Sequence, residues 1–224
     1  MNIIKVTRGY IANYLIPHYH KELKPIYGNV IRACGPVKVG SVFKNYIYGY
    51  HIEYQNQNVK DLWKVLPNLL KGAKYTLVMP DNHQRRQYDT KPVGTDFAPI
   101  EMMPINMPII SQCENFEDLY DYVSSVFTAN GHANAQLTVY DTAYRIGFNM
   151  TPQILPVKYV YLAAGAYDGA LCLYGAGWIA HNKDKNFSRN TREFVRIPTK
   201  CFGSDFPNID SSGIEALLCD FFNI

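Results

Sequence analysis

Apolar side chains recur every three or four positions over much of the chain, and this pattern predicts a mainly helical protein. The clearest example runs from Glu114 to Thr128. Its first turn holds Glu117 and Asp118, at the end where the helix dipole favours negative charge. Further helices are expected over residues 9–23, where Pro17 interrupts the pattern, and over 59–70, 139–148, 166–174 and 211–222.

Fewer segments have the composition of β-strands. Residues 41–54 are rich in β-branched and aromatic side chains and predict a strand, or a hairpin that turns near Gly49. Short strands are also expected at 75–79 and 159–162. The predicted fold class is therefore mainly α with small β elements, an α+β arrangement.

Five prolines between residues 80 and 112 interrupt the regular patterns. This segment is either a long surface loop, with a functional lid as one use, or a boundary between lobes. We therefore expect a single domain over residues 1–224, with a possible division into a mixed α/β lobe at 1–112 and a helical lobe at 113–224.

Residues 114–149 contain two predicted helices joined by a short link of small and polar residues. This order is typical of a helix-hairpin-helix element, whose backbone N–H groups at the hairpin and at the second helix bind a DNA phosphate. Such hairpins usually carry Gly-x-Gly, and here the link carries Ala133-Asn134-Ala135. The candidate DNA contacts of this element are Gly131, His132, Asn134, Gln136, Thr138 and Arg145.

The segment Leu137–Gly147 reads LTVYDTAYRIG and is followed by PVKYVYLAAG. These two stretches resemble a poorly characterised family of bacterial and mobile-element proteins, and the resemblance covers roughly residues 129–165. A histidine often stands in that family where this chain has Ala163, so any role of that histidine does not transfer.

The same segment bears a distant resemblance to helix-hairpin-helix DNA glycosylases, which carry a catalytic aspartate, commonly in an Asp-Thr pair. The resemblance implies this role for Asp141, although Asp141 lies inside the second predicted helix rather than beyond it. Base excision also needs aromatic rings that hold a flipped base, and Tyr140 and Tyr144 are the candidates. Each has a structural alternative, because Asp141 can pair with Arg145 one turn later and both tyrosines can belong to the core. Two further residues are alternatives for catalysis. Asp168 offers a carboxylate before a helix, and Lys158 offers an amine that could form a Schiff base.

Positive charge is concentrated in one window. The chain has a net charge of +3, whereas residues 181–200 hold six cations and two anions, a net charge of +4, interleaved with Phe187 and Phe194. Cations beside aromatic rings can hold phosphates and stack on bases, although such a run can also be an ordinary solvated surface. The DNA contacts expected here are Lys183, Lys185, Arg189, Arg192 and Arg196.

Other features exclude several classes of protein. The five cysteines are widely spaced and form no CxxC pair, which argues against a disulfide framework and a zinc site and favours a reducing compartment. The amino end lacks a signal-peptide pattern, and no apolar run approaches about 18 residues. We therefore expect a cytoplasmic protein with no membrane span, no metal and, since water is the nucleophile in glycosidic hydrolysis, no cofactor.

Two functional hypotheses with DNA as the partner follow, and a third interpretation without DNA is a tyrosine-rich structural or protein-interaction module. The first is a DNA glycosylase, a hydrolase that excises a damaged or modified base in DNA repair or antiviral defence. The alternative is a non-catalytic DNA-binding protein or a phage-related structural or interaction protein, which would use the hairpin and the basic window without changing the DNA.

Overall fold

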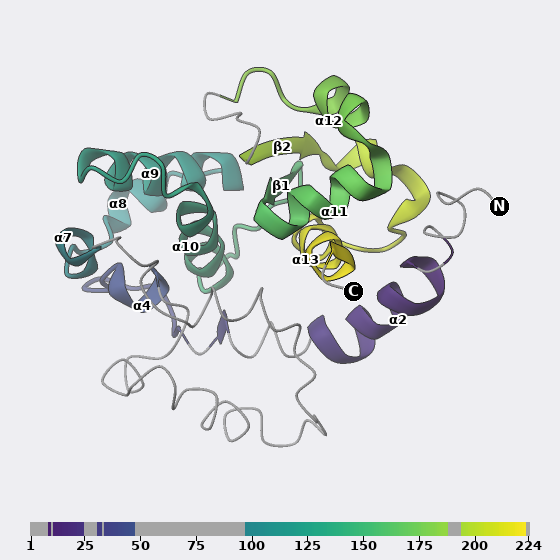
Figure 1. Ribbon diagram of the computed structural model, residues 1–224. Coiled ribbons are helices and arrows are strands. Elements are labelled where there is room, and N and C mark those ends of the chain that lie inside the picture. Colours follow the sequence, from purple (N-terminus) through teal and green to yellow (C-terminus); the bar gives the residue numbers. More distant parts are fainter. Residues whose placement is uncertain are drawn as a thin grey trace. The chain divides into compact units, whose positions relative to one another are not determined.

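The computed structural model describes residues 9, 11–24, 31–32, 34–47, 97–187 and 194–222. The described residues are mainly helical and include a small antiparallel sheet of two strands, which confirms the predicted fold class (Figure 1). The helix predicted at 59–70, the strand predicted at 75–79 and residues 80–96 of the proline-rich segment lie outside this part of the chain.

The chain divides into two compact units. Unit 1 combines residues 1–25 with residues 156–224, and unit 2 consists of residues 26–155. The lobe boundary predicted after residue 112 falls inside unit 2.

Unit 2 is helical where it is described, and aromatic side chains fill much of its core. Its helices are α4 (Lys44–Ile47), α7 (Ala98–Glu101), α8 (Met107–Ile110), α9 (Phe116–Ala129) and α10 (Gln136–Phe148). The buried side chains include Phe43, Tyr46, Phe97, Phe116, Leu119, Tyr120, Phe127, Tyr140 and Ile146. Proline occupies the first turn of α7 and of α8, where a missing N–H leaves no hydrogen bond unmade. Part of the proline-rich segment thus consists of helix starts.

Helices α9 and α10 correspond to the predicted hairpin element and pack against each other. The Asn115 side chain caps α9 by accepting a hydrogen bond from the Asp118 N–H at 3.0 Å. Helix α10 begins at Gln136, three residues before the predicted start, and its cap position is Ala135, which offers no side-chain acceptor.

The strand predicted over residues 41–54 is wrong in its described part. Residues 44–47 form helix α4, and the β-structure there is an isolated bridge between Val42 and Pro104. Phe43, Tyr46 and Ile47 are all buried, at the i, i+3, i+4 spacing that a helix places on one face. Burial of this face overrides the β-propensity of the individual side chains.

Unit 1 contains the sheet and the carboxyl-terminal helices. Its elements are the π-helical turns η1 (Ile11–Leu15) and η2 (Tyr19–Leu23), which flank α2 (Ile16–His18), then β1 (Tyr159–Ala163), α11 (Ala164–Tyr174), α12 (Ala176–Asn182), β2 (Phe194–Pro198), the 3₁₀ segment η4 (Thr199–Asp205) and α13 (Ser211–Phe222). The break predicted at Pro17 is absorbed by π-helical turns on both sides, so the described path stays helical from residue 11 to 23.

The two strands pair antiparallel in a defined register. Tyr159 lies opposite Pro198 at one end, and Ala163 lies opposite Phe194 at the other. Helix α11 follows β1 directly and packs closely on α13. A Cβ at Gly169 of α11 would overlap the carbonyl oxygen of Leu218 in α13, so a glycine permits this close approach.

Candidate functional site

The candidate carboxylate Asp141 lies inside α10 and is buried. Its exposed fraction is 8%, and that of Arg145, one turn later, is 2%. The Arg145 Nη2 atom lies 3.7 Å from Asp141 Oδ2. The two residues therefore form the i,i+4 ion pair that was the structural alternative for Asp141.

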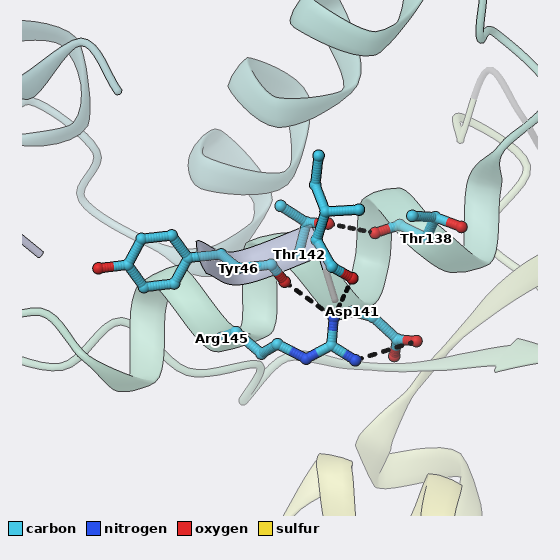
Figure 2. Close-up of polar contacts among 6 residues, drawn as sticks. Tyr46, Thr138, Asp141, Thr142 and Arg145 are labelled. Carbon is cyan, nitrogen blue, oxygen red and sulfur yellow. Dashed lines mark hydrogen bonds and ion pairs between the residues drawn. The ribbon is translucent and has the colours of Figure 1, made fainter. Parts of the chain in front are cut away.

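The Arg145 guanidinium is also held by the backbone of α4. Its Nη1 atom donates hydrogen bonds to the carbonyl oxygens of Tyr46 and Ile47, both at 2.8 Å. Figure 2 shows the guanidinium between these carbonyls and the Asp141 carboxylate. Because Tyr46 and Ile47 are the last residues of α4, Arg145 satisfies carbonyl groups at the end of that helix. Arg145 thus presents little surface to a phosphate in this conformation.

The two tyrosines proposed for base stacking lie on either side of Asp141. Tyr140 is 3% exposed and contacts the ring of Phe116 edge-on, with centroids 5.9 Å apart. Tyr144 is half-buried; its ring is nearly parallel to that of Tyr140 at 6.2 Å and meets Phe148 edge-on. Tyr140 is a core side chain, and Tyr144 extends the same row of rings towards the surface.

The link between α9 and α10 is the more accessible part of the hairpin. Gly131 and Asn134 are exposed, and Gly131 has a φ of 83°, the left-handed conformation that glycine adopts readily. The His132 N–H donates to the Phe127 carbonyl at 2.8 Å, and the His132 ring lies 4.9 Å from that of Phe97. Gln136 and Thr138 are half-buried in the first turn of α10.

The alternative catalytic groups lie in unit 1, whereas Asp141 belongs to unit 2. Asp168 is half-buried in the second turn of α11, not before a helix as predicted, because α11 begins at Ala164. Lys158 is exposed, with its Nζ atom 5.1 Å from the centre of the Tyr159 ring. Neither environment buries the group in the way that an activated acid or amine requires.

In the basic window, Arg196 is held by a carboxylate and by two aromatic rings. Its Nε donates to Asp184 Oδ2 at 2.8 Å, and its guanidinium carbon lies 4.5 Å from the ring centres of both Tyr159 and Phe187. Burial alone raises the pKa of Asp184, but hydrogen bonds from Arg196 and from the Asn186 N–H outweigh it and hold the pKa below its ordinary value. The carboxylate is therefore charged at neutral pH and neutralises Arg196.

Four lysines lie in the segments next to this neutralised pair. Lys183 and Lys185 flank Asp184, whose N–H donates to the Arg196 carbonyl at 2.9 Å. The Thr199 N–H donates to the Lys158 carbonyl at 2.9 Å, so the backbone of Lys158 lies next to the residue that precedes Lys200. Lys183 is half-buried, and the other three lysines are exposed.

Within the described residues, no acidic side chain lies within ion-pair distance of these lysines, which we call the lysine group: Lys158, Lys183, Lys185 and Lys200. Arg189 and Arg192 lie outside the described part of the chain. The sequence pattern includes Lys200 in the basic window but not among the expected DNA contacts, and it leaves Lys158 outside the window, because it does not predict strand β2.

No described helix combines the length and the apolar character needed to cross a membrane. The described residues also contain no group of three or more His, Cys, Asp or Glu side chains arranged to hold a metal ion. Comparison of the chain with models of protein families, with curated proteins and with solved structures finds no match.

Proposed function

We propose that this chain is a non-catalytic nucleic-acid-binding protein whose unit 1 contacts the phosphate backbone through the lysine group. The observation that carries the proposal is that four lysines lie in segments whose backbones meet at a short sheet, with the neighbouring acid Asp184 engaged by Arg196. Lysines on one surface are the footprint expected of a protein that binds nucleic acid without reading its sequence.

The spacing of the lysine group suits a phosphate backbone. Asp184 lies beside Arg196 and Lys158 lies beside Thr199, three residues further along the chain. At about 3.3 Å per residue this separation is about 10 Å, so the lysine group can span several phosphates of one strand. Between these lysines, Arg196 is held in place by the rings of Tyr159 and Phe187 and by its ion pair with Asp184.

The geometry around Asp141 supports binding over base excision. A catalytic carboxylate must reach the sugar of a flipped nucleotide, and Asp141 is buried and paired with Arg145. In unit 2, the start of α10, whose cap position Ala135 offers no side-chain acceptor, supports a second contact with phosphate through the first backbone N–H groups of that helix.

Salt titration of oligonucleotide binding tests the proposal. In Lys183→Gln/Lys185→Gln, we expect binding about tenfold weaker or more at low salt, and a slope of log affinity against log salt that is smaller by about 2. The matched variant Lys21→Gln/Lys38→Gln removes the same charge from exposed positions outside the lysine group and should bind like the wild type.

Three results would overturn this proposal. They are absence of binding at low salt, equal losses in the two double variants, and abasic sites in DNA treated with the wild type that disappear with Asp141→Asn. The last result would establish base excision instead.

A further inference from the structure

A row of aromatic rings lies where α11 meets α12 in unit 1. Tyr174 and Trp178 are stacked, with ring centres 4.2 Å apart and an angle of 18° between the rings. Phe202 meets both rings edge-on, at 5.9 Å and 5.4 Å, and is 2% exposed. Tyr174 and Trp178 are half-buried. The buried Phe202 ring thus supports two rings that keep part of their surface at the protein exterior.

The stack is held in place by polar contacts and by the backbone. The Tyr174 hydroxyl donates to Asp205 Oδ2 at 2.9 Å. Gly175 has a φ of 82° and turns the chain sharply between the two helices, so Tyr174 ends α11 and Trp178 lies in the first turn of α12. Rings fixed in this way lose little conformational entropy when a ligand stacks on them.

The exposed residues close to Trp178 in the sequence are mostly small. Ala176, Gly177 and Ala180 are exposed, and His181, also exposed, lies one turn after Trp178 on the same helix face. Helix α12 ends at Asn182, and Lys183 of the lysine group follows, with its N–H donating to the Ile179 carbonyl at 2.9 Å. At 1.5 Å per residue, Trp178 and Lys183 are about 8 Å apart along the helix direction.

From this juxtaposition we infer that the ligand of unit 1 is single-stranded nucleic acid, with Trp178 stacking on a base and Lys183 contacting a phosphate of the same strand. The inference rests on the proposed function and names the class of nucleic acid. An aromatic ring on a helix, with a cation where the helix ends, matches a strand whose bases are unpaired, since every base then offers a flat face next to a phosphate. Bases in a duplex are already stacked on one another and must be unpaired before they reach the indole.

Fluorescence of Trp178 reports directly on stacking. The sequence contains one other tryptophan, Trp63, so full-length protein with Trp63→Phe leaves Trp178 as the sole indole. We expect an oligo(dT) 20-mer to quench this fluorescence and to bind about tenfold more tightly than a 20-base-pair duplex at low salt. Trp178→Leu should weaken oligo(dT) binding about tenfold and leave duplex binding unchanged. Trp178→Phe, which keeps an aromatic face, should retain most of the oligo(dT) affinity.

The outcomes separate this inference from the proposed function. Equal binding of the two nucleic acids, absence of quenching, or equal quenching by heparin would overturn the inference of single-strand stacking. The proposed function would still stand if Lys183→Gln/Lys185→Gln weakened binding of both nucleic acids. Absence of binding to both at low salt would overturn the inference and the proposed function together. Circular dichroism of Trp178→Leu and Trp178→Phe distinguishes a lost stack from a lost fold, and only losses in folded variants count.

Discussion

At the scale of single residues, packing accounts for the segment Leu137–Gly147. Tyr140 and Ile146 are core side chains, and Asp141 pairs with Arg145. A Cβ at Gly147 would overlap the carbonyl oxygen of Ile154, whose N–H also donates to the Gly147 carbonyl at 3.0 Å. Each of these positions therefore meets a requirement of unit 2 itself.

Arg145→Met tests the structural role of the guanidinium. Methionine keeps much of the buried volume but removes the hydrogen bonds that Arg145 donates to the carbonyls of Tyr46 and Ile47, and its ion pair with Asp141. We expect the free energy of unfolding, measured by urea denaturation, to fall by about 3–5 kcal/mol. Asp141→Asn, which keeps a side-chain acceptor, should cost less, and a loss below about 1 kcal/mol in Arg145→Met would contradict this role.

The sequence could predict only part of this site. The spacing of Asp141 and Arg145 indicates an ion pair on one helix face, and the structure contains that pair. The two carbonyls that Arg145 also binds come from residues 98 and 99 positions earlier in the chain. No local pattern marks such partners, because a carbonyl is present at every residue.

At the scale of elements, prediction succeeded where a helix carries a complete pattern of its own. Helix α13 begins and ends at the predicted residues, and α9 begins and ends within two residues of the predicted bounds. Strand β2 was missed because Phe194–Pro198 lies in a highly charged window whose pairing with β1 is set by distant residues. The pattern does not predict the short helices α7 and α8, because proline is common in loops as well as at helix starts.

The contact between α11 and α13 depends on the absence of a side chain at Gly169. In Gly169→Ala, the new Cβ would overlap the Leu218 carbonyl, and the two helices must move apart. We expect the midpoint of urea unfolding to fall, with a loss of about 1–3 kcal/mol. The matched variant Gly177→Ala adds a Cβ in α12 where no atom beyond the adjoining helix backbone lies within 4 Å, so its stability should be unchanged or higher. Equal losses in the two variants would show that general helix effects dominate.

At the scale of the whole molecule, unit 2 contains a buried thiol and a buried phenol that make its stability depend on pH. Unit 2 buries Cys34 and Tyr46, and burial raises the pKa of Cys34 from 9.0 to about 11 and that of Tyr46 from 10.0 to about 12. Since both folded-state values are raised, the neutral forms favour folding. Their stabilising contribution is fully present below the unfolded-state pKa values and is lost as pH rises through the folded-state values.

Alkaline pH should therefore destabilise the wild type more than Cys34→Ala. From about pH 8 to about pH 11, we expect the free energy of unfolding to fall further in the wild type, by on the order of 2 kcal/mol, because Cys34→Ala removes one of the two buried acids. Urea denaturation at the two pH values measures this difference. Cys172→Ala removes an exposed thiol from unit 1 and should keep the wild-type dependence. If the free energy of unfolding depended on pH equally in the wild type and in Cys34→Ala, the raised pKa of Cys34 would be contradicted.

The assembly of unit 1 from both ends of the chain has a consequence for synthesis on the ribosome. Lys24 pairs with Asp210 at 3.8 Å, and a Cβ at Gly213 would meet the Tyr19 hydroxyl, so the first helical turns pack against the start of α13. At about 5–20 residues per second, about 10–40 s pass between the emergence of these two segments. While all of unit 2 is made, α13 does not yet exist. During this time it cannot cover Ile11 and Leu15 in the amino-terminal helical turns. A chaperone that shields this early apolar segment would act during that interval.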